Sequence, residues 1–225
     1  MPTTSAENYL KVIHSHQGTE RRRVKTKEIA DKLEVSLPSV SGMLKSLSKD
    51  GLVEYEPYKG ARLTDEGRTM ALKVIRNHRL IEVFLVQTLG YSWDEVHAEA
   101  ERLEHAVSDQ LVERIDGFLN HPKFDPHGDP IPTAEGELQH REMINLSDAE
   151  PEMQVQVERV LDQTPEVLRY LDRNGLRPGA VFTIEEVLSF DGQMFLRVGD
   201  DDVTISERLA GKMLVTECIE TTSDG

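Results

Sequence analysis

A mainly helical fold with β structure in two places is predicted by three features of the 225-residue sequence. Apolar residues recur at helical spacing through most of residues 5–120. A short stretch at 52–64 breaks this spacing and has the composition of a β-hairpin. From about residue 146, apolar and polar residues alternate as in β-strands. We therefore expect a helical chain with a small β-element near its start and a β-rich carboxyl-terminal part.

The first seventy residues have the layout of a winged helix-turn-helix, which is helix, turn, helix and then hairpin. Ser, Thr and Gly mark the expected helix ends, since these residues are favoured as caps. The hairpin turn is expected in Pro57-Tyr58-Lys59-Gly60. The expected helices are 5–16 capped by Ser5, 26–33 capped by Thr26, and 36–50 capped by Ser36 and followed by Gly51.

The middle of the chain predicts two long helices. The first runs from Thr64 to Leu89 and stops at Gly90. A capping box at Ser92-Trp93-Asp94-Glu95 opens the second, which we expect to reach Asn120 with a break. Residues 121–137 are rich in Pro, Gly and Asp, so they predict an irregular connector and a domain edge.

The last part of the chain predicts a small β-barrel of roughly 75–80 residues. Phe190-Asp191-Gly192-Gln193 separates two apolar runs and has the composition of a hairpin turn. Strands are expected near 155–160, 181–188, 194–198, 203–205 and 212–217, with one short helix at 165–173.

Charge is distributed unevenly along the chain. The net charge is −15, yet residues 1–70 carry 12 Lys+Arg against 10 Asp+Glu, which leaves 14 against 31 for the remainder. This asymmetry is typical of a DNA-reading head on an acidic body, although a solvated acidic surface would give it too.

The sequence contains no run of 18 apolar residues, so no membrane span is predicted, and no secretory signal is expected. Cys218 is the one cysteine, so no intrachain disulfide can form and a cytoplasmic location is expected.

Histidine and glutamate follow one face of each long helix. His78 and Glu82 are at i and i+4, and the next helix carries His97, Glu101, Glu104 and His105 at i, i+4, i+7 and i+8. Apolar residues flank both stripes, so the polar groups are expected beside a buried seam. A divalent cation would neutralise the carboxylates and accept imidazole lone pairs. The alternative, a solvated charged face, is left open by the pattern alone.

At this point the residues resemble the diphtheria-toxin-repressor family of iron- and manganese-dependent regulators, over essentially the whole chain. The blocks that carry the resemblance are Ala6-Glu7-Asn8-Tyr9-Leu10, Ser36-Leu37-Pro38-Ser39-Val40-Ser41, Lys49-Asp50-Gly51-Leu52-Val53, Leu63-Thr64-Asp65-Glu66-Gly67, Asn77-His78-Arg79-Leu80, Glu104-His105 and Gly128-Asp129-Pro130-Ile131-Pro132. Their order and spacing together are specific. The resemblance implies three domains: a winged helix-turn-helix at 1–72, a helical metal-binding and dimerisation domain at 73–142, and an SH3-like barrel at 143–225.

The resemblance also implies two metal sites. The primary site would use Glu101, Glu104 and His105 with Asn8 of the first helix. The ancillary site would use His78, Glu82 and His97, completed from the third domain by Gln163 and Glu166. Iron-type members have sulfur at the positions of Asn8 and Glu101. Oxygen at both positions favours Mn²⁺ over Fe²⁺.

One further departure concerns Lys11. It stands where two-domain manganese regulators have an acidic ligand, so their dinuclear arrangement is not expected here.

The resemblance implies a repressor that Mn²⁺, or alternatively Fe²⁺, activates, and that binds palindromic operator DNA as a homodimer to control metal homeostasis genes. No membrane partner and no organic cofactor are expected. Candidate DNA contacts lie at the start of the recognition helix, in the preceding basic segment and in the hairpin: Lys25, Thr26, Lys27, Ser36, Pro38, Ser39, Ser41, Lys45, Lys59 and Arg62.

The sequence argues against one rival function and leaves two others open. A ferritin-like di-metal enzyme needs Glu-x-x-His, but the residue three before His105 is Arg102, and no hydrolase signature or phosphate loop appears, so we do not expect an enzyme. A winged-helix regulator with a small organic effector stays open. So does a metal-buffering protein that has lost DNA binding.

Overall fold

The computed structural model describes residues 3–18 and 20–218, and the chain divides into two compact units. The first unit comprises the chain up to His78 together with Arg102–Val112 and Pro132–Leu138. The second comprises Arg79–Glu101, Glu113–Ile131 and the chain from Gln139 onward. The division falls inside one continuous helix, α4 (Asp65–Leu89).

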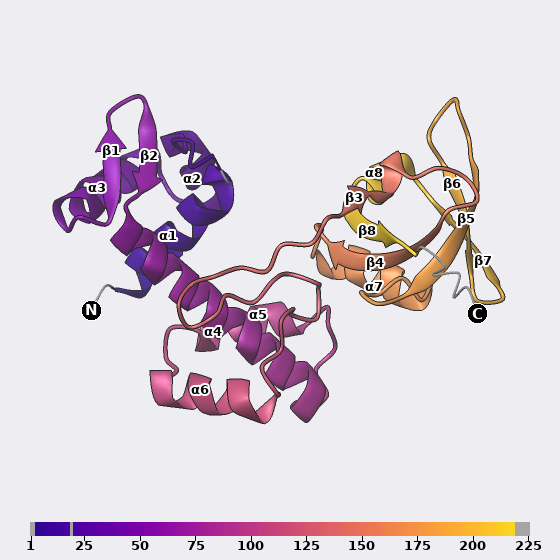
Figure 1. Cartoon of the computed structure of the whole chain (residues 1–225). Coiled ribbons are helices and arrows are strands. Elements are labelled where there is room, and N and C mark those ends of the chain that lie inside the picture. Colours follow the sequence, from indigo (N-terminus) through magenta and orange to yellow (C-terminus); the bar gives the residue numbers. More distant parts are fainter. Residues whose placement is uncertain (1–2, 19, 219–225) are drawn as a thin grey trace, which may run out of the picture. The chain divides into compact units, whose positions relative to one another are not determined.

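The amino-terminal part of the first unit is the predicted winged helix-turn-helix (Figure 1). Apolar residues at helical spacing, among them Leu10, Ile13, Ile29 and Leu44, bury into one core between the helices and the hairpin. The hairpin pairs antiparallel from Val53–Leu63 to Glu56–Gly60. Its elements are α1 (Thr4–Gln17), α2 (Thr26–Leu33), α3 (Leu37–Lys49), β1 (Val53–Glu56) and β2 (Gly60–Leu63).

Two of the three helix caps predicted within the winged helix-turn-helix were wrong by one or two positions. The side chain of Thr3, not Ser5, accepts the Ala6 N–H at 3.3 Å, because Ser5 is already inside α1. Lys25, not Thr26, is the extended residue before α2. The prediction for Ser36 is confirmed, since its hydroxyl accepts the Ser39 N–H at 3.3 Å.

The second long helix is two helices, α5 (Val96–Leu103) and α6 (Asp109–Phe118). The N–H groups of Ala106 and Val107 turn back to the Leu103 carbonyl, and the Ser108 side chain caps α6. The prediction that Glu104 and His105 share a helix face with His97 and Glu101 is therefore wrong, because Glu104 and His105 lie in the turn after α5.

A six-stranded antiparallel sheet forms most of the carboxyl-terminal part, in the order β3-β8-β4-β5-β6-β7 (Figure 1). Val155, Val157, Ile184 and Leu196 alternate into its core, which α7 covers with Leu168. In the described residues β3 and β7 are the sheet's end strands. The elements are β3 (Ile144–Asn145), η1 (Leu146–Asp148), β4 (Gln154–Val160), α7 (Pro165–Arg173), β5 (Val181–Val187), β6 (Met194–Val198), β7 (Asp201–Ile205), α8 (Glu207–Ala210) and β8 (Met213–Glu217).

Within the second unit, the connector that precedes the sheet is held against β4. Trp93 belongs to the same apolar core as the sheet. The Val160 N–H donates to the His127 carbonyl at 2.9 Å. Gly128 has φ +87°, and a Cβ there would overlap the carbonyl oxygen of Glu158. Only glycine fits this contact, so β4 fixes the path of the chain beside His127.

Across the described ranges, no helix combines the length and apolar character needed to span a membrane.

Candidate metal centres

Three groups of His, Asp and Glu side chains bring their ligand atoms within 4.8 Å of one another in the described residues. Two of them contain only residues that the sequence predicted as ligands, and the third was not predicted. The groups are His78–Glu82–His97, His78–Glu101–Glu104 and Glu82–Asp125–His127.

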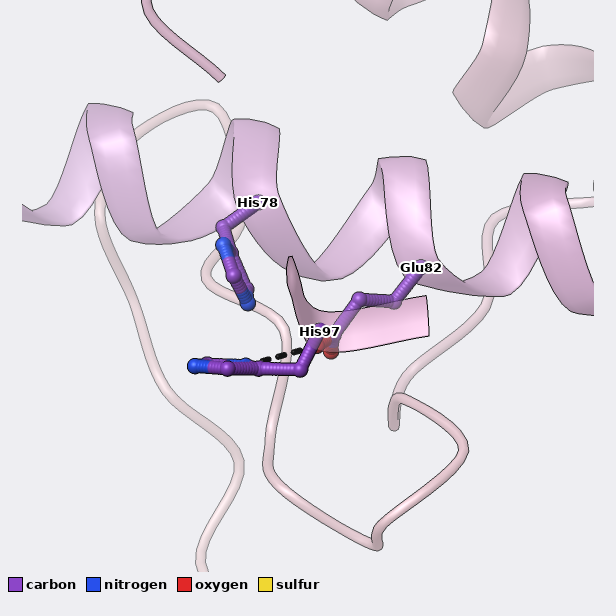
Figure 2. Close-up of side chains that lie close together, drawn as sticks. All are labelled: His78, Glu82 and His97. Atoms are coloured by element: carbon purple, nitrogen blue, oxygen red, sulfur yellow. Dashed lines mark hydrogen bonds and ion pairs between the residues drawn. The ribbon is translucent and has the colours of Figure 1, made fainter. Parts of the chain in front are cut away.

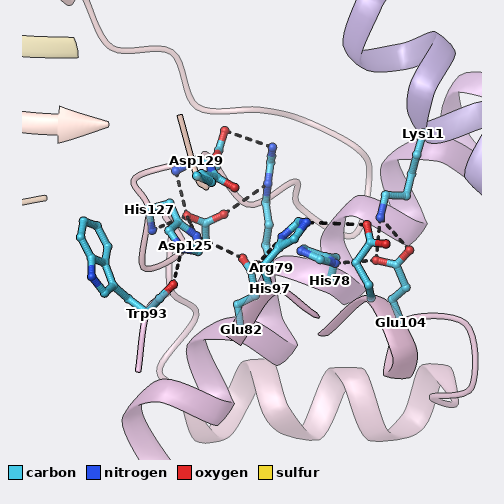
Figure 3. Close-up of polar contacts among 12 residues, drawn as sticks. Lys11, His78, Arg79, Glu82, Trp93, His97, Glu104, Asp125, His127 and Asp129 are labelled. Carbon is cyan, nitrogen blue, oxygen red and sulfur yellow. Dashed lines mark hydrogen bonds and ion pairs between the residues drawn. The ribbon is translucent and has the colours of Figure 1, made fainter. Parts of the chain in front are cut away.

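Glu104 is the centre of a cluster in the first unit that also contains Lys11, His78 and His105. The Glu104 side chain is only 1% exposed. The Lys11 ammonium contacts both of its oxygens, at 2.7 and 2.8 Å. Nδ1 of His78 lies 2.6 Å from Oε2 (Figure 3). Nε2 of His105 lies 3.0 Å from Oε1. Burial raises the pKa of Glu104, but the His78 hydrogen bond and the Lys11 charge outweigh burial and hold this pKa below its usual value.

The turn after α5 reaches α1 through His105. Its Nδ1 lies 2.5 Å from Oε2 of Glu7, and its Nε2 lies 2.8 Å from Oδ1 of Asn8. Asn8 therefore lies next to His105, and its role as a metal ligand stays a prediction. Glu7 was missed, although Glu7, Asn8 and Lys11 fall at i, i+1 and i+4 on α1. That spacing placed a carboxylate beside the predicted ligand.

Three of the predicted ancillary residues, His78, Glu82 and His97, lie on α4 and α5. His78 and Glu82 are one turn apart on α4, and the ring of His97 lies beside Glu82 with its Nδ1 at 3.1 Å from Oε1 (Figure 2). Glu82 is 1% exposed, whereas the His97 side chain is 47% exposed. Glu101, predicted for the primary site, is half-exposed and lies 3.8 Å from Nε2 of His97.

The third group consists of Glu82, Asp125 and His127, and all three side chains are buried. His127 is inaccessible to solvent and stacks on Trp93 with ring centroids 5.8 Å apart. Its Nε2 lies 2.7 Å from the Trp93 carbonyl oxygen, so Nε2 carries the hydrogen and donates it. Its Nδ1 has no hydrogen-bond partner and lies 3.7 Å from a Glu82 oxygen and 4.0 Å from an Asp125 oxygen.

Titration in this group is shifted by burial and by crowded carboxylates. Burial first, and then the charges of Asp129 and Glu82, raise the pKa of Asp125 to about 7. Burial lowers the pKa of His127, but its contacts with Glu82 and Asp125 outweigh burial and raise that pKa above its usual value. The site as a whole therefore favours a positive charge, which either a proton or a cation can supply.

These residues fit a divalent cation. A metal-bound histidine typically donates its other N–H to a carbonyl, which fixes the tautomer. His127 has this arrangement, and its other nitrogen, Nδ1, faces two buried carboxylates and has no hydrogen-bond partner. A buried, unpartnered nitrogen is unfavourable unless something binds it. The sequence offered no periodic signal here, because Asp125 and His127 lie in the irregular connector.

Of the two ligands predicted from the third domain, Glu166 lies in none of the three groups, as far as the described residues extend. The amide of the other, Gln163, donates to Asp129 at 2.7 Å, and Asp129 also pairs with Arg79 and Arg159. Glu166 is exposed in the first turn of α7.

The predicted DNA contacts lie mostly at the surface of the winged helix-turn-helix. Ser36, Pro38 and Ser39 are exposed at the start of α3, and the Ser36 and Ser39 hydroxyls lie 2.8 Å apart. Arg62 pairs with Glu54, and Lys59 pairs with Glu56, each at 2.8 Å. The remaining candidates are exposed at Lys25, Lys27 and Lys45 and half-buried at Thr26 and Ser41.

Family models match almost the whole chain. Residues 1–61 match the N-terminal DNA-binding domain of iron-dependent repressors, and residues 64–133 match their metal-binding and dimerisation domain. Residues 144–217 match the FeoA domain.

Proteins similar over the full length have related descriptions. The iron-dependent repressor IdeR of Mycobacterium leprae is 32% identical, covering 92% of this chain and 94% of that protein. A manganese-dependent transcriptional repressor in complex with manganese is 38% identical and superimposes with a TM-score of 0.85, covering 95% of this chain and all of the other. The manganese regulator SloR is 34% identical, with a TM-score of 0.73 over 95% of this chain and 98% of its own.

Proposed function

The chain belongs to the iron-dependent repressor family of metal-dependent transcriptional regulators, and we propose that Mn²⁺ is the ion that activates it. The family's members are not enzymes, and their partners are DNA and a second copy of the chain.

The observation that carries this proposal is the buried cluster of Glu82, Asp125 and His127. Two carboxyl groups and an imidazole nitrogen without a hydrogen-bond partner lie together away from water. When bound, a divalent ion would neutralise the carboxylates and accept the lone pair.

The donor atoms favour manganese. Oxygen and imidazole nitrogen suit Mn²⁺, and Fe²⁺ accepts them too, whereas softer metals select sulfur. Among the described residues, none of the candidate ligand groups contains sulfur. One similar structure holds manganese according to its description. The alternative is an iron-responsive repressor, as the name of the IdeR relative says of that protein.

We assign primary and ancillary sites from these contacts. The primary site comprises Glu104 and His105 with Asn8 and Glu7 of α1, and Glu101 stays a candidate ligand. The ancillary ligands are Glu82 and His97 with His78, and Asp125 and His127 form a second set around the same Glu82. Gln163 and Glu166 stay weaker candidates, because Gln163 is committed to Asp129.

The primary site would connect α1 of the DNA-reading head to the turn after α5. His105 binds the α1 residues Glu7 and Asn8, so a metal held there stabilises that contact. A ligand shifts an equilibrium only by its differential affinity for the two states. We propose that the metal-bound arrangement is the DNA-competent one.

We further propose three domains: residues 1–72 bind DNA, residues 73–142 bind metal and dimerise, and residues 143–225 form the SH3-like barrel. Residues 219–225 lie outside the described residues. A palindromic operator upstream of metal homeostasis genes and a cytoplasmic location complete the proposal.

Operator fragments selected from a random DNA pool provide the test. Fluorescence anisotropy would measure DNA affinity with chelator, Mn²⁺, Fe²⁺ under anaerobic conditions, or Zn²⁺. We expect Mn²⁺ to strengthen binding at least tenfold. Glu104→Gln should remove most of this gain, while Glu135→Gln, at an exposed loop position, should keep it.

Three results would separate the alternatives. Activation by Fe²⁺ alone would favour the iron-responsive reading. DNA binding that no metal changes would favour an organic effector. Metal binding without any selected DNA would favour a metal buffer.

A further inference from the structure

Lys11 contacts Glu104, the central carboxylate of the proposed primary site. It lies on α1, and its ammonium contacts both oxygens of Glu104 at 2.7 and 2.8 Å (Figure 3). An ammonium has three donors and no lone pair, so it cannot bind a metal. It is instead the counter-ion of Glu104, a carboxylate that the proposed function assigns as a metal ligand.

Glu104 needs such a counter-ion when no metal is bound. Its side chain is 1% exposed, and a buried carboxylate without a paired charge is strongly unfavourable. The other cluster partners, His78 and His105, are imidazoles, which must be neutral to serve as ligands. Among the contacts of Glu104 in the described residues, Lys11 is the one that can carry the positive charge while both histidines stay neutral and able to bind a metal.

The Lys11 side chain is 18% exposed, so it reaches Glu104 from the edge of the cluster and can return to solvent. Its charge and that of a divalent ion repel each other if both contact Glu104. Lys11 and the ion therefore compete for the same two oxygens.

We propose that Lys11 is an internal cation that substitutes for the metal in the metal-free protein and thereby sets the metal concentration at which the repressor responds. This inference rests on the proposed function, since it concerns the affinity of that site. It has two opposite consequences: Lys11 stabilises the metal-free protein, and it weakens metal binding. An ion pair with a purely structural role gives the first consequence without the second.

Lys11→Met, which is unbranched and one atom shorter than lysine and removes the charge, separates these roles. We expect its Mn²⁺ affinity at the primary site, measured from the EPR signal of free Mn²⁺, to rise about tenfold or more. In chelator its Tm should fall. Lys11→Arg keeps the charge and should stay close to the unmodified chain. Lys73→Met is the matched control, because Lys73 pairs with Asp109 at 2.7 Å on an exposed surface, and it should change neither quantity.

A second measurement uses the unmodified chain, in case Lys11→Met does not fold. Acetic anhydride labels accessible amines, and mass spectrometry reads the extent at Lys11. We expect Mn²⁺ to raise labelling at Lys11 severalfold, as the ammonium leaves Glu104, and to leave Lys73 unchanged.

Unchanged or weaker Mn²⁺ binding by folded Lys11→Met, or labelling at Lys11 that Mn²⁺ does not raise, would overturn the inference and leave the proposed function standing. If the unmodified chain itself binds no Mn²⁺, the proposed function and the inference both fail.

Discussion

Asp125 and His127 show how strongly single residues depend on their surroundings. Both would be ordinary polar side chains in an exposed loop. Here they are buried beside Glu82, and their pKa values are both raised, that of Asp125 to about 7. A carboxyl with such a pKa holds its proton in the folded chain at a pH where the unfolded chain has lost it. The stability of the metal-free protein therefore depends on pH at near-neutral values.

We predict that the metal-free protein loses stability as the pH rises from 5 to 8. For Asp125, the folded chain binds the extra proton between about pH 4 and 7, so its contribution is fully present below the unfolded pKa and disappears as the pH passes about 7. His127 acts in the same direction, since its folded pKa is also raised. The effect of one such proton is at most about 1.4 kcal/mol per pH unit.

Urea unfolding in chelator at several pH values measures this dependence. Asp125→Asn should flatten it, because the amide does not titrate. Glu104 does not interfere, since its lowered pKa makes stability fall only on acidification below its unfolded pKa. Equal slopes for Asp125→Asn and the unmodified chain would contradict the assignment.

At the level of residues, the sequence predicted ligands where a helix repeated them and missed ligands where the chain is irregular. His78 and Glu82 are on one face of α4 as their spacing indicates. Asp125 and His127 lie in a connector without a period, so only three-dimensional packing brings them to Glu82. Whether either set binds metal stays a prediction.

At the scale of elements, the pattern of apolar residues could not predict where α5 ends. Apolar residues continue at helical spacing through Val107, so the sequence predicts a longer helix. The chain turns at Leu103 instead, where the Asn77 amide donates to the Glu104 carbonyl at 3.2 Å. This tertiary contact satisfies the Glu104 carbonyl outside the helix, and the side chains of Glu104 and His105 contact α1.

The packing of the connector against β4 is a second feature at this scale, and a substitution at Gly128 tests it. A Cβ at this residue would overlap the Glu158 carbonyl, and its φ of +87° also disfavours other residues. We predict that Gly128→Ala costs about 2–4 kcal/mol of stability. It should also weaken Mn²⁺ binding, because the neighbouring His127 carbonyl accepts from β4.

Thermal unfolding and Mn²⁺ titration of Gly128→Ala make the comparison. Gly117→Ala is the control, since Gly117 is in α6 and a Cβ there meets open space. That substitution should leave the stability unchanged or raise it slightly. A Gly128→Ala protein that is as stable as the control would show that the connector is not held by β4.

At the scale of the whole molecule, charge and symmetry define how DNA is contacted. All of the excess negative charge lies after residue 70, so the acidic part repels DNA phosphates and the amino-terminal head is the surface that can approach them. One head alone makes a small interface. The family's dimerisation domain, matched at 64–133, presents two heads related by symmetry to two half-sites.

We predict that operator affinity depends on the helical phase of the two half-sites. Two heads on one face of B-DNA read half-sites separated by about one turn, roughly 10–10.5 base pairs, or a multiple. Inserting five base pairs rotates one half-site to the opposite face, and we expect affinity in Mn²⁺ to fall at least tenfold. Deleting one half-site outright should weaken binding to a similar extent. Anisotropy with the selected operator and these variants measures the change, and equal affinity for all of them would mean that each head binds on its own.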